Sequence, residues 1–157
     1  MKIKILIPVY NDWQSVFKLL ENINSVVFNL DHEFSVIIVN DASTETKPEL
    51  FVNLEKLNSI KIINMKENRG HARCNATGLK HIFENEEFDY VIPMDGDGED
   101  RPEEIKQLID NLNYHPDKPI VGERIKRSEG IFFKFCYFIH KLITLTFTGQ
   151  SIKYGNF

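Results

Sequence analysis

Val91-Ile92-Pro93-Met94-Asp95-Gly96-Asp97-Gly98 is the stretch that decides the fold of this chain. A short apolar run ends here, and two carboxylates follow it with one residue between them. Side chains alternate in an extended segment, so Asp95 and Asp97 are expected to point the same way. Two carboxylates at the end of a buried strand suit a divalent cation that carries phosphate oxygens. An Asp-x-Asp pair alone is weak, and its place after an apolar run gives it weight.

Apolar runs of the same kind recur along the chain and alternate with helical spacing. Strands are expected at residues 4–9, 34–39, 60–64 and 89–94, with a short fifth at 120–122. Helices are expected over 11–30, capped by Asn11, over 48–57, after Gly70, and after a cap at Asp100. Strands that are apolar throughout and separated by helices predict a mostly parallel sheet covered on both faces, hence an open, Rossmann-like α/β fold.

Polar clusters follow four of these strands, at residues 10–12, 41–44, 69–73 and 95–97. Ligands of open α/β folds bind beyond the carboxyl ends of the strands. The sequence therefore predicts that the four clusters form one site.

Length and composition fit one globular domain, because 157 residues with 42% apolar content can bury a sizeable core. A net charge of −4 argues against a nucleic-acid binder that relies on bulk positive charge. Cys74 and Cys136 have no metal-ligand spacing, which favours reduced core thiols in a cytoplasmic protein. Lys2 and Lys4 interrupt the first apolar run, so no signal peptide is expected.

Each polar cluster also has a purely structural interpretation. Tyr10 offers an aromatic wall for a nucleobase, yet its segment also makes a rigid turn before a helix. Asp41 can accept a ring N–H of uracil or guanine, or it can form an Asx turn. Arg69 and Arg73 strengthen an anion site at a helix N-terminus, while His71 is interpreted as a polar residue of the first turn.

Two features lie near the end of the chain. Arg124 and Arg127 follow the expected fifth strand and are either a phosphate clamp or part of a solvated loop. Residues 131–147 are aromatic and apolar but carry Lys134 and Lys141, seven apart, on one helical face. Such an amphipathic helix lies on a membrane, on another part of the protein, or on its own sheet.

Together these clusters resemble the family 2 glycosyltransferases, which have the GT-A fold. The matching segments keep the family's order over nearly the whole chain: 7–12, 39–44, 68–70 with Ala72, Arg73 and Asn75, 94–105, and 122–124. The order and spacing together are specific, although each match alone is weak. Residues 95–104 and 127–157 resemble the polyprenyl-phosphate sugar transferase branch, such as the dolichyl-phosphate mannose synthases. No dinucleotide or P-loop glycine motif is present.

The resemblance implies a UDP- or GDP-sugar donor and Mg²⁺ or Mn²⁺. It implies that Asp97 ligates the metal and that Asp95 lies beside the metal and the ribose. The nucleotide-contacting residues would be Pro8, Tyr10, Asp12, Asp41, Arg73 and Asp95. The residues expected to take part in transfer are Asp95, Asp97, Arg124 and Arg127.

Two departures from the family pattern are visible. Asn40-Asp41 stands where the family often has two aspartates, and the base contact is placed on the second. Family members continue past the region of 155–157, so a truncated C-terminus is expected. We expect a single domain over 1–157, with a donor-binding core over 1–126 and an amphipathic segment over 127–157 that faces a membrane or the acceptor.

The activity expected from the resemblance is inverting transfer of a sugar to a polyprenyl phosphate or a cell-surface glycan. The protein would be cytoplasmic or associated with the inner face of the membrane, and it would not bind nucleic acid. One alternative is a nucleotide-sugar-binding module without transfer activity. A nucleotidyltransferase is disfavoured, because residues 8–12 lack the glycine-rich basic segment that this class usually shows.

Overall fold

The computed structural model describes residues 1–49, 54–112, 114–116 and 118–122, together with residues 138, 139, 142 and 146. The chain divides into two compact units, Met1–Pro116 and Asp117–Phe157. The first unit contains the sheet and the helices that position the candidate site.

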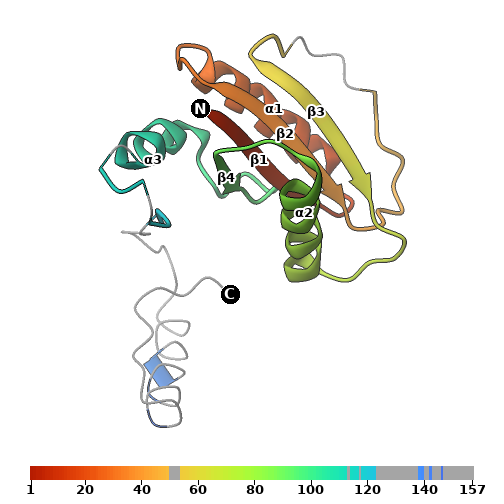
Figure 1. Ribbon diagram of the computed structural model, residues 1–157. Coiled ribbons are helices and arrows are strands. Elements are labelled where there is room, and N and C mark those ends of the chain that lie inside the picture. Colours follow the sequence, from red (N-terminus) through yellow and green to blue (C-terminus); the bar gives the residue numbers. More distant parts are fainter. Residues whose placement is uncertain are drawn as a thin grey trace. The chain divides into compact units, whose positions relative to one another are not determined.

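Four parallel strands form the sheet, and the predicted open α/β fold is confirmed (Figure 1). The strands are β1 (Lys2–Val9), β2 (Glu33–Asn40), β3 (Leu57–Asn64) and β4 (Tyr90–Pro93), in the order β3-β2-β1-β4. The chain therefore adds strands on one side of β1 and then crosses to the other side. In open α/β sheets this reversal is the topological switch point, where ligands bind.

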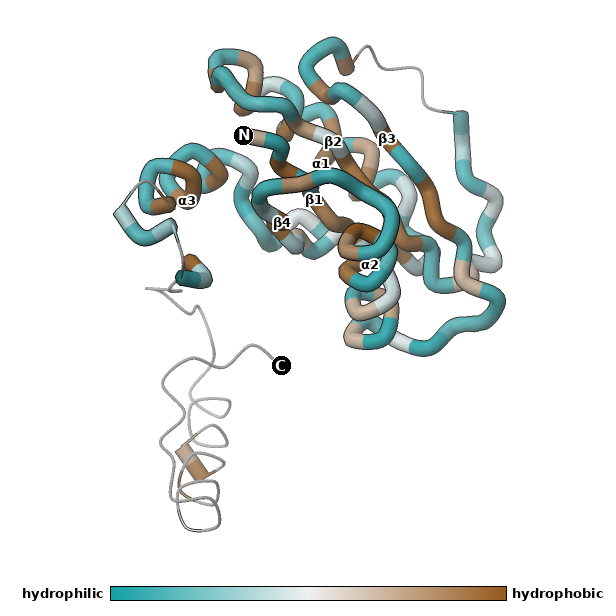
Figure 2. The backbone as a smooth tube through the Cα atoms, in the orientation of Figure 1, coloured by the Kyte–Doolittle hydropathy of each residue, from teal (hydrophilic) through white to brown (hydrophobic). Residues whose placement is uncertain are grey.

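Helices cover both faces of the sheet. Helices α1 (Trp13–Val27) and α3 (Ile105–Leu112), the latter preceded by the short 3-10 helix η1 (Pro102–Glu104), pack on one face. Helix α2 (His71–Asn85) packs on the other, where Cys74 and Ile82 contact Leu6, Ile37 and Val39. The tube coloured by hydropathy shows the hydrophobic brown recurring along the strands, between teal and white stretches (Figure 2).

Strand β1 is buried from Ile3 to Val9 and includes a lysine. The Nζ of Lys4 lies 3.0 Å from Glu86 Oε2, and Lys61 contacts the other carboxylate oxygen of Glu86. The hydrogen bond from Lys61, together with Lys4, lowers the pKa of Glu86. The buried ammonium is therefore paired, which is the condition for placing a charge in a central strand.

Two expected elements are wrong. Of the helix expected over 48–57, residues 48, 49 and 54–56 are not helical and Leu57 begins β3, while 50–53 lie outside the described residues. A hydrogen bond from Leu57 N to Leu54 O closes a turn there. The fifth strand expected over 120–122 is irregular, because these residues have no partner strand in the described part of the chain.

Candidate functional site

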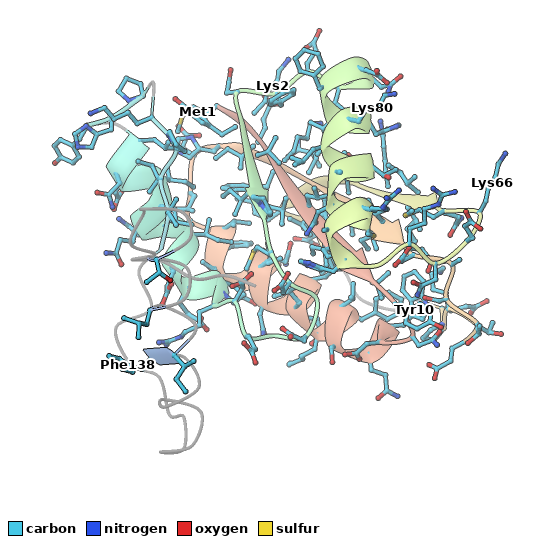
Figure 3. The ribbon with its side chains drawn as sticks, turned by 90° about the horizontal axis from the view of Figure 1, so that it is seen from below. Met1, Lys2, Tyr10, Lys66, Lys80 and Phe138 are labelled. Atoms are coloured by element: carbon cyan, nitrogen blue, oxygen red, sulfur yellow. The ribbon has the colours of Figure 1, made fainter. Side chains whose placement is uncertain are left out.

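A hollow of about 270 Å³ opens at the carboxyl ends of β1 and β4. It is lined by Pro8, Val9, Tyr10, Asp12, Val16, His71, Asp95, Gly96 and Asp97. Tyr10 lies at the opposite end of β1 from Met1 and Lys2 (Figure 3). The hollow thus occupies the switch point between β1 and β4, at the carboxyl ends of the strands where the sequence predicted the site. Residues of three of the four predicted clusters line it, and none of residues 41–44 does.

Both aspartates of the predicted pair line this hollow. Their loop is folded by carboxylates: Asp100 Oδ2 accepts the backbone N–H of Asp95 at 2.7 Å, and Asp97 Oδ1 accepts that of Glu99 at 2.9 Å. The expectation that Asp100 caps the following helix is wrong, because η1 begins after Arg101 without a side-chain cap. Asp100 instead holds the loop that presents Asp95.

Gly96 lets this loop lie against the end of β1. A Cβ at Gly96 would stand 2.9 Å from the carbonyl oxygen of Pro8 and 2.9 Å from Val16 Cγ2. Only a residue without a side chain permits so close an approach. The glycine between the two aspartates is therefore a packing requirement of the site.

His71 is the residue that the sequence interpretation missed. It is the first residue of α2, and its Nε2 lies 2.7 Å from Asp95 Oδ1 and 3.1 Å from Asn75 Nδ2. It also lines the hollow. A histidine in a first helical turn gives no signal by itself, because only the fold shows that α2 begins beside the loop after β4.

The loop after β1 carries Tyr10, which lines the hollow and is 48% exposed. Asp12, rather than the expected Asn11, caps α1 and accepts the backbone N–H of Ser15 at 3.3 Å. Asn11 adopts a left-handed conformation with φ of 55°, in which asparagine is tolerated better than most residues. The prediction of a helix start here is right, and its cap is shifted by one residue.

Polar side chains join the ends of β1, β2 and β3. Asn11 accepts the Thr44 backbone N–H at 2.8 Å and donates its own backbone N–H to Ser43 Oγ at 3.0 Å. Asn40 accepts the Ser43 N–H and donates to Asn64 Oδ1, both at 2.9 Å. The Asn40 amide donates one hydrogen bond and accepts another. An ionised aspartate, which the family often has at this position, could only accept.

Asp41 is buried, 4% exposed, and does not line the hollow. Its two oxygens accept the backbone N–H groups of Arg69 and Gly70, each at 2.8 Å. Gly70 has a φ of 82°, a conformation that favours glycine. Asp41 therefore fixes the turn into α2 from a distant part of the sequence, and its carboxylate does not form the local Asx turn that the sequence offered as the structural alternative.

None of the three arginines predicted for the site is among the described residues that line the hollow. Arg73 lies in the first turn of α2 with an exposed side chain and is not among the residues that line the hollow. Arg124 and Arg127 lie outside the described residues, as do nearly all residues of the 127–157 segment.

The carboxylates fit a metal that is shared with a ligand. Among the residues that the structure describes, no group of three or more His, Cys, Asp or Glu side chains could enclose an ion. Mg²⁺ is commonly held by one or two carboxylates together with substrate phosphates and water rather than by an all-protein cage. Asp95 and Asp97 provide a donor set of this kind at one hollow.

An open parallel sheet with carboxylates at its switch point defines an α/β domain of the nucleotide-binding class. Residues 4–156 match the family described as Glycosyl transferase family 2, and the chain belongs to this family. The resemblance drawn from the sequence motifs is thus confirmed.

The chain is similar to curated relatives that act on a lipid phosphate. It is 28% identical over 156 residues to the undecaprenyl-phosphate 4-deoxy-4-formamido-L-arabinose transferase of Photorhabdus laumondii, covering 98% of this chain and 47% of that protein. The enzyme of the same name from Salmonella choleraesuis is 27% identical over 158 residues, covering 98% and 46%. The chain thus spans about half the length of these relatives.

Two solved structures share the fold. Residues 1–349 of S. aureus TarS in complex with UDP-GlcNAc align with a TM-score of 0.59 at 24% identity, covering 82% of this chain and 38% of that one. The mannosyltransferase PcManGT from Pyrobaculum calidifontis, in complex with GDP-Man and Mn²⁺, aligns with a TM-score of 0.52 at 21% identity, covering 80% and 35%. At these identities the similarity establishes the fold.

Proposed function

We propose that this chain is the donor-binding part of a metal-dependent, inverting glycosyltransferase that uses a nucleotide-diphosphate sugar. The observation that carries the proposal is the pair Asp95 and Asp97, which line one hollow at the switch point of the sheet. Membership of glycosyl transferase family 2 supports the same activity.

Asp97 and Asp95 would hold Mg²⁺ or Mn²⁺. A cation bound to the donor's diphosphate stabilises the negative charge that develops on the leaving group, which is a main barrier to glycosyl transfer. The chain's own part is to keep both carboxylates aimed at the hollow. The bonds from Asp95 N to Asp100 and from Glu99 N to Asp97 serve this purpose.

The donor extends beyond the hollow. At about 270 Å³, the hollow is slightly below the range of ~300–1,000 Å³ typical of small-molecule sites, so it suits part of a nucleotide sugar. Tyr10 would stack on the base, with Pro8 and Asp12 beside it. Asp41 would act indirectly, by fixing the turn that begins α2. Arg73 would lie next to the nucleotide. The base is uracil or guanine.

Transfer forms a bond from the acceptor oxygen to the anomeric carbon while the bond from that carbon to the diphosphate oxygen breaks. The acceptor enters opposite the leaving group, so the anomeric configuration inverts. A hydroxyl acceptor would lose a proton to a base. A phosphate acceptor is already anionic and needs positioning, for which we propose Arg124 and Arg127.

The acceptor we favour is a polyprenyl phosphate at the inner face of a membrane, within cell-envelope glycan synthesis. The names of the curated relatives support this choice, since they are undecaprenyl-phosphate transferases. In the described part of the chain, no helix has the length and apolar character that a bilayer crossing requires. The amphipathic segment 127–157 would provide peripheral contact.

The central test replaces Asp97 by Asn and, as a matched control, Glu103 by Gln. The Glu103→Gln substitution removes the same charge from the same acidic stretch, but Glu103 does not line the hollow. Calorimetry with UDP and GDP, with Mn²⁺ and with EDTA, should show metal-dependent binding that Asp97→Asn abolishes and Glu103→Gln retains. Unchanged metal-dependent binding in Asp97→Asn would refute the assignment.

A second candidate is a binding module that holds the nucleotide sugar without transferring it. The chain covers only 46–47% of the curated relatives, so residues that the relatives use for transfer can lie outside it, which is the observation behind this second candidate. A radiolabelled donor incubated with a short polyprenyl phosphate separates the two functions. Binding without labelled lipid would support the module, and labelled lipid with inverted configuration would support the transferase.

A further inference from the structure

Beside the proposed metal site, α2 begins with an imidazole aimed at one of the carboxylates. His71 Nε2 lies 2.7 Å from Asp95 Oδ1, within ordinary hydrogen-bond distance, although the two residues are far apart in the sequence. The Asp95 side chain is 50% exposed and that of His71 is 61% exposed. An exposed pair of this kind contributes little to folding stability. Its effect is therefore on where the Asp95 carboxylate points.

The hydrogen-bond chemistry defines the roles of the three side chains. An ionised carboxylate only accepts, so Nε2 of His71 carries a proton and donates to Asp95. The Asn75 amide nitrogen, 3.1 Å from the same Nε2, cannot then donate to it. Turning the Asn75 amide over places its oxygen beside the Nε2–H, where it can accept a share of the proton that His71 donates to Asp95.

We propose that His71 is a positioning residue for Asp95, with the Asn75 amide beside the same ring nitrogen, Nε2. The proposal rests on the proposed function, because it assigns Asp95 to the metal and nucleotide. His71 occupies Oδ1 and leaves Oδ2 for the ligand. In the described part of the chain no other side chain bonds the Asp95 carboxylate, so its direction depends on His71.

The arrangement also ties two elements of the site together. Asp41 fixes the turn before α2 through the N–H groups of Arg69 and Gly70, so the position of His71 is set by the end of β2. Asp100 fixes the backbone of Asp95. The side chain and the backbone of Asp95 are thus held by different partners, and removing His71 frees only the side chain.

The test compares His71→Ala with His71→Gln, whose amide N–H can reach the same carboxylate, and uses His81→Ala on α2 as a control outside the hollow. Mn²⁺ affinity in the presence of UDP or GDP is measured by electron paramagnetic resonance. Partners behind a metal ligand typically change metal affinity by ~10–100-fold. We expect a loss in this range for His71→Ala, most of it recovered in His71→Gln, and none in His81→Ala.

A second readout separates this proposal from the proposed function. The Asp95 carboxyl ¹³C resonance, recorded without metal or nucleotide, should shift in His71→Ala and return toward its original position in His71→Gln. An unmoved resonance, or equal loss of Mn²⁺ affinity in both His71 variants, would overturn the positioning role. If the unmodified protein bound no Mn²⁺ with nucleotide, the proposed function would fall, and the resonance would still decide whether His71 directs Asp95.

Discussion

Gly96 shows how a single atom can control the site. A methyl group there would stand 2.9 Å from both Pro8 O and Val16 Cγ2, and the backbone oxygen cannot move aside without shifting β1. We expect Gly96→Ala to displace the loop of Asp95 and Asp97 and to weaken Mn²⁺-dependent UDP or GDP binding at least tenfold. Overpacking of this kind also costs about 1–3 kcal/mol of stability.

Calorimetry and urea unfolding measure the two effects of Gly96→Ala. Gly122→Ala is the matched control, because a Cβ at Gly122 would meet no atom of the described residues within 4 Å. Nucleotide binding by Gly96→Ala equal to that of the control would contradict the close-packing argument.

The buried thiol of Cys74 should make the free energy of unfolding depend on pH. Its thiol donates to Val39 O at 3.2 Å, and burial, with a smaller effect of Asp41, raises its pKa from 9.0 to about 11. Above pH 9 the unfolded thiol loses its proton while the folded thiol keeps it, so the unfolded state binds fewer protons. The contribution of this thiol to the free energy of unfolding should therefore be fully present below pH 9. It should be lost as the pH rises from 9 to 11.

Urea unfolding in a Cys136→Ser background tests this pH dependence. Cys74→Ala should lose this part of the decline, although other groups that titrate above pH 9 affect both proteins equally. The same native thiol should react slowly with a thiol reagent at pH 8. A Cys74→Ala protein whose stability falls as steeply as that of its parent would contradict the prediction.

At the scale of single residues, the sequence indicated which side chains belong to the site better than it indicated their hydrogen-bond partners. Asp95 and Asp97 could be found because two carboxylates directly after an apolar strand are a local pattern. The strand alternation expected of them is wrong, because β4 ends at Pro93 and Gly96 and Asp97 lie in a turn. His71 could not be found in this way, since its partner is brought to it by the crossing from β1 to β4.

The sequence predicts Asn11 and Asp100 as caps because both residue types favour caps. In the fold, the Asn11 side chain bonds the distant Thr44, and that of Asp100 bonds Asp95 within its own loop.

Helix α2 shows the limit of apolar patterns at the scale of an element. It faces the sheet with Cys74, Gly78 and Ile82, whereas Leu79 is 43% exposed and Phe83 is 79% exposed. A Cβ at Gly78 would lie 2.3 Å from Leu6 Cδ1, so the helix packs through its smallest residue. The helix was predictable from its apolar residues, but not which face is buried, because close packing at a glycine has no hydrophobic signature. Those apolar residues are Ala72, Ala76, Leu79, Ile82 and Phe83, and of them only Ile82 is buried.

Neighbouring residues of α2 therefore make a matched pair. Ile82 is fully buried, so Ile82→Ala should lower the free energy of unfolding by about 2–5 kcal/mol. Phe83→Ala removes a larger side chain but should change it by no more than about 0.5 kcal/mol, as for other exposed positions. Urea unfolding of both variants checks the orientation, and a larger loss in Phe83→Ala would contradict it.

The same reasoning explains the other elements. Strands β1 and β2 were predictable because both are almost continuously buried, which is the signature of a central parallel strand. Residues 48–57 were expected to be helical because their leucines have helical spacing. Leu57 instead pairs with Phe34 in the sheet, and burial of that one side chain does not reveal which element buries it.

For the whole molecule, the question is how much of the site lies in the first compact unit. Every residue that lines the hollow, and both buried core clusters of the described residues, fall within Met1–Pro116. A chain that ends after Pro116 should therefore unfold cooperatively in urea. The phosphate clamp proposed at Arg124 and Arg127 would be absent from it.

Comparing that shorter chain with the full chain and with an Arg124→Ala, Arg127→Ala double variant isolates the clamp. A charge-assisted hydrogen bond contributes about 1.5–3 kcal/mol, and 1.4 kcal/mol corresponds to about tenfold in affinity. Because we propose that the arginines position the acceptor phosphate, the double variant should keep its Mn²⁺-dependent UDP or GDP affinity. An equal loss of tenfold or more in the shorter chain and the double variant would assign the arginines to the donor's diphosphate instead. Full affinity in both would assign the arginines to the acceptor, and a loss in the shorter chain alone would place the missing contact elsewhere in residues 117–157.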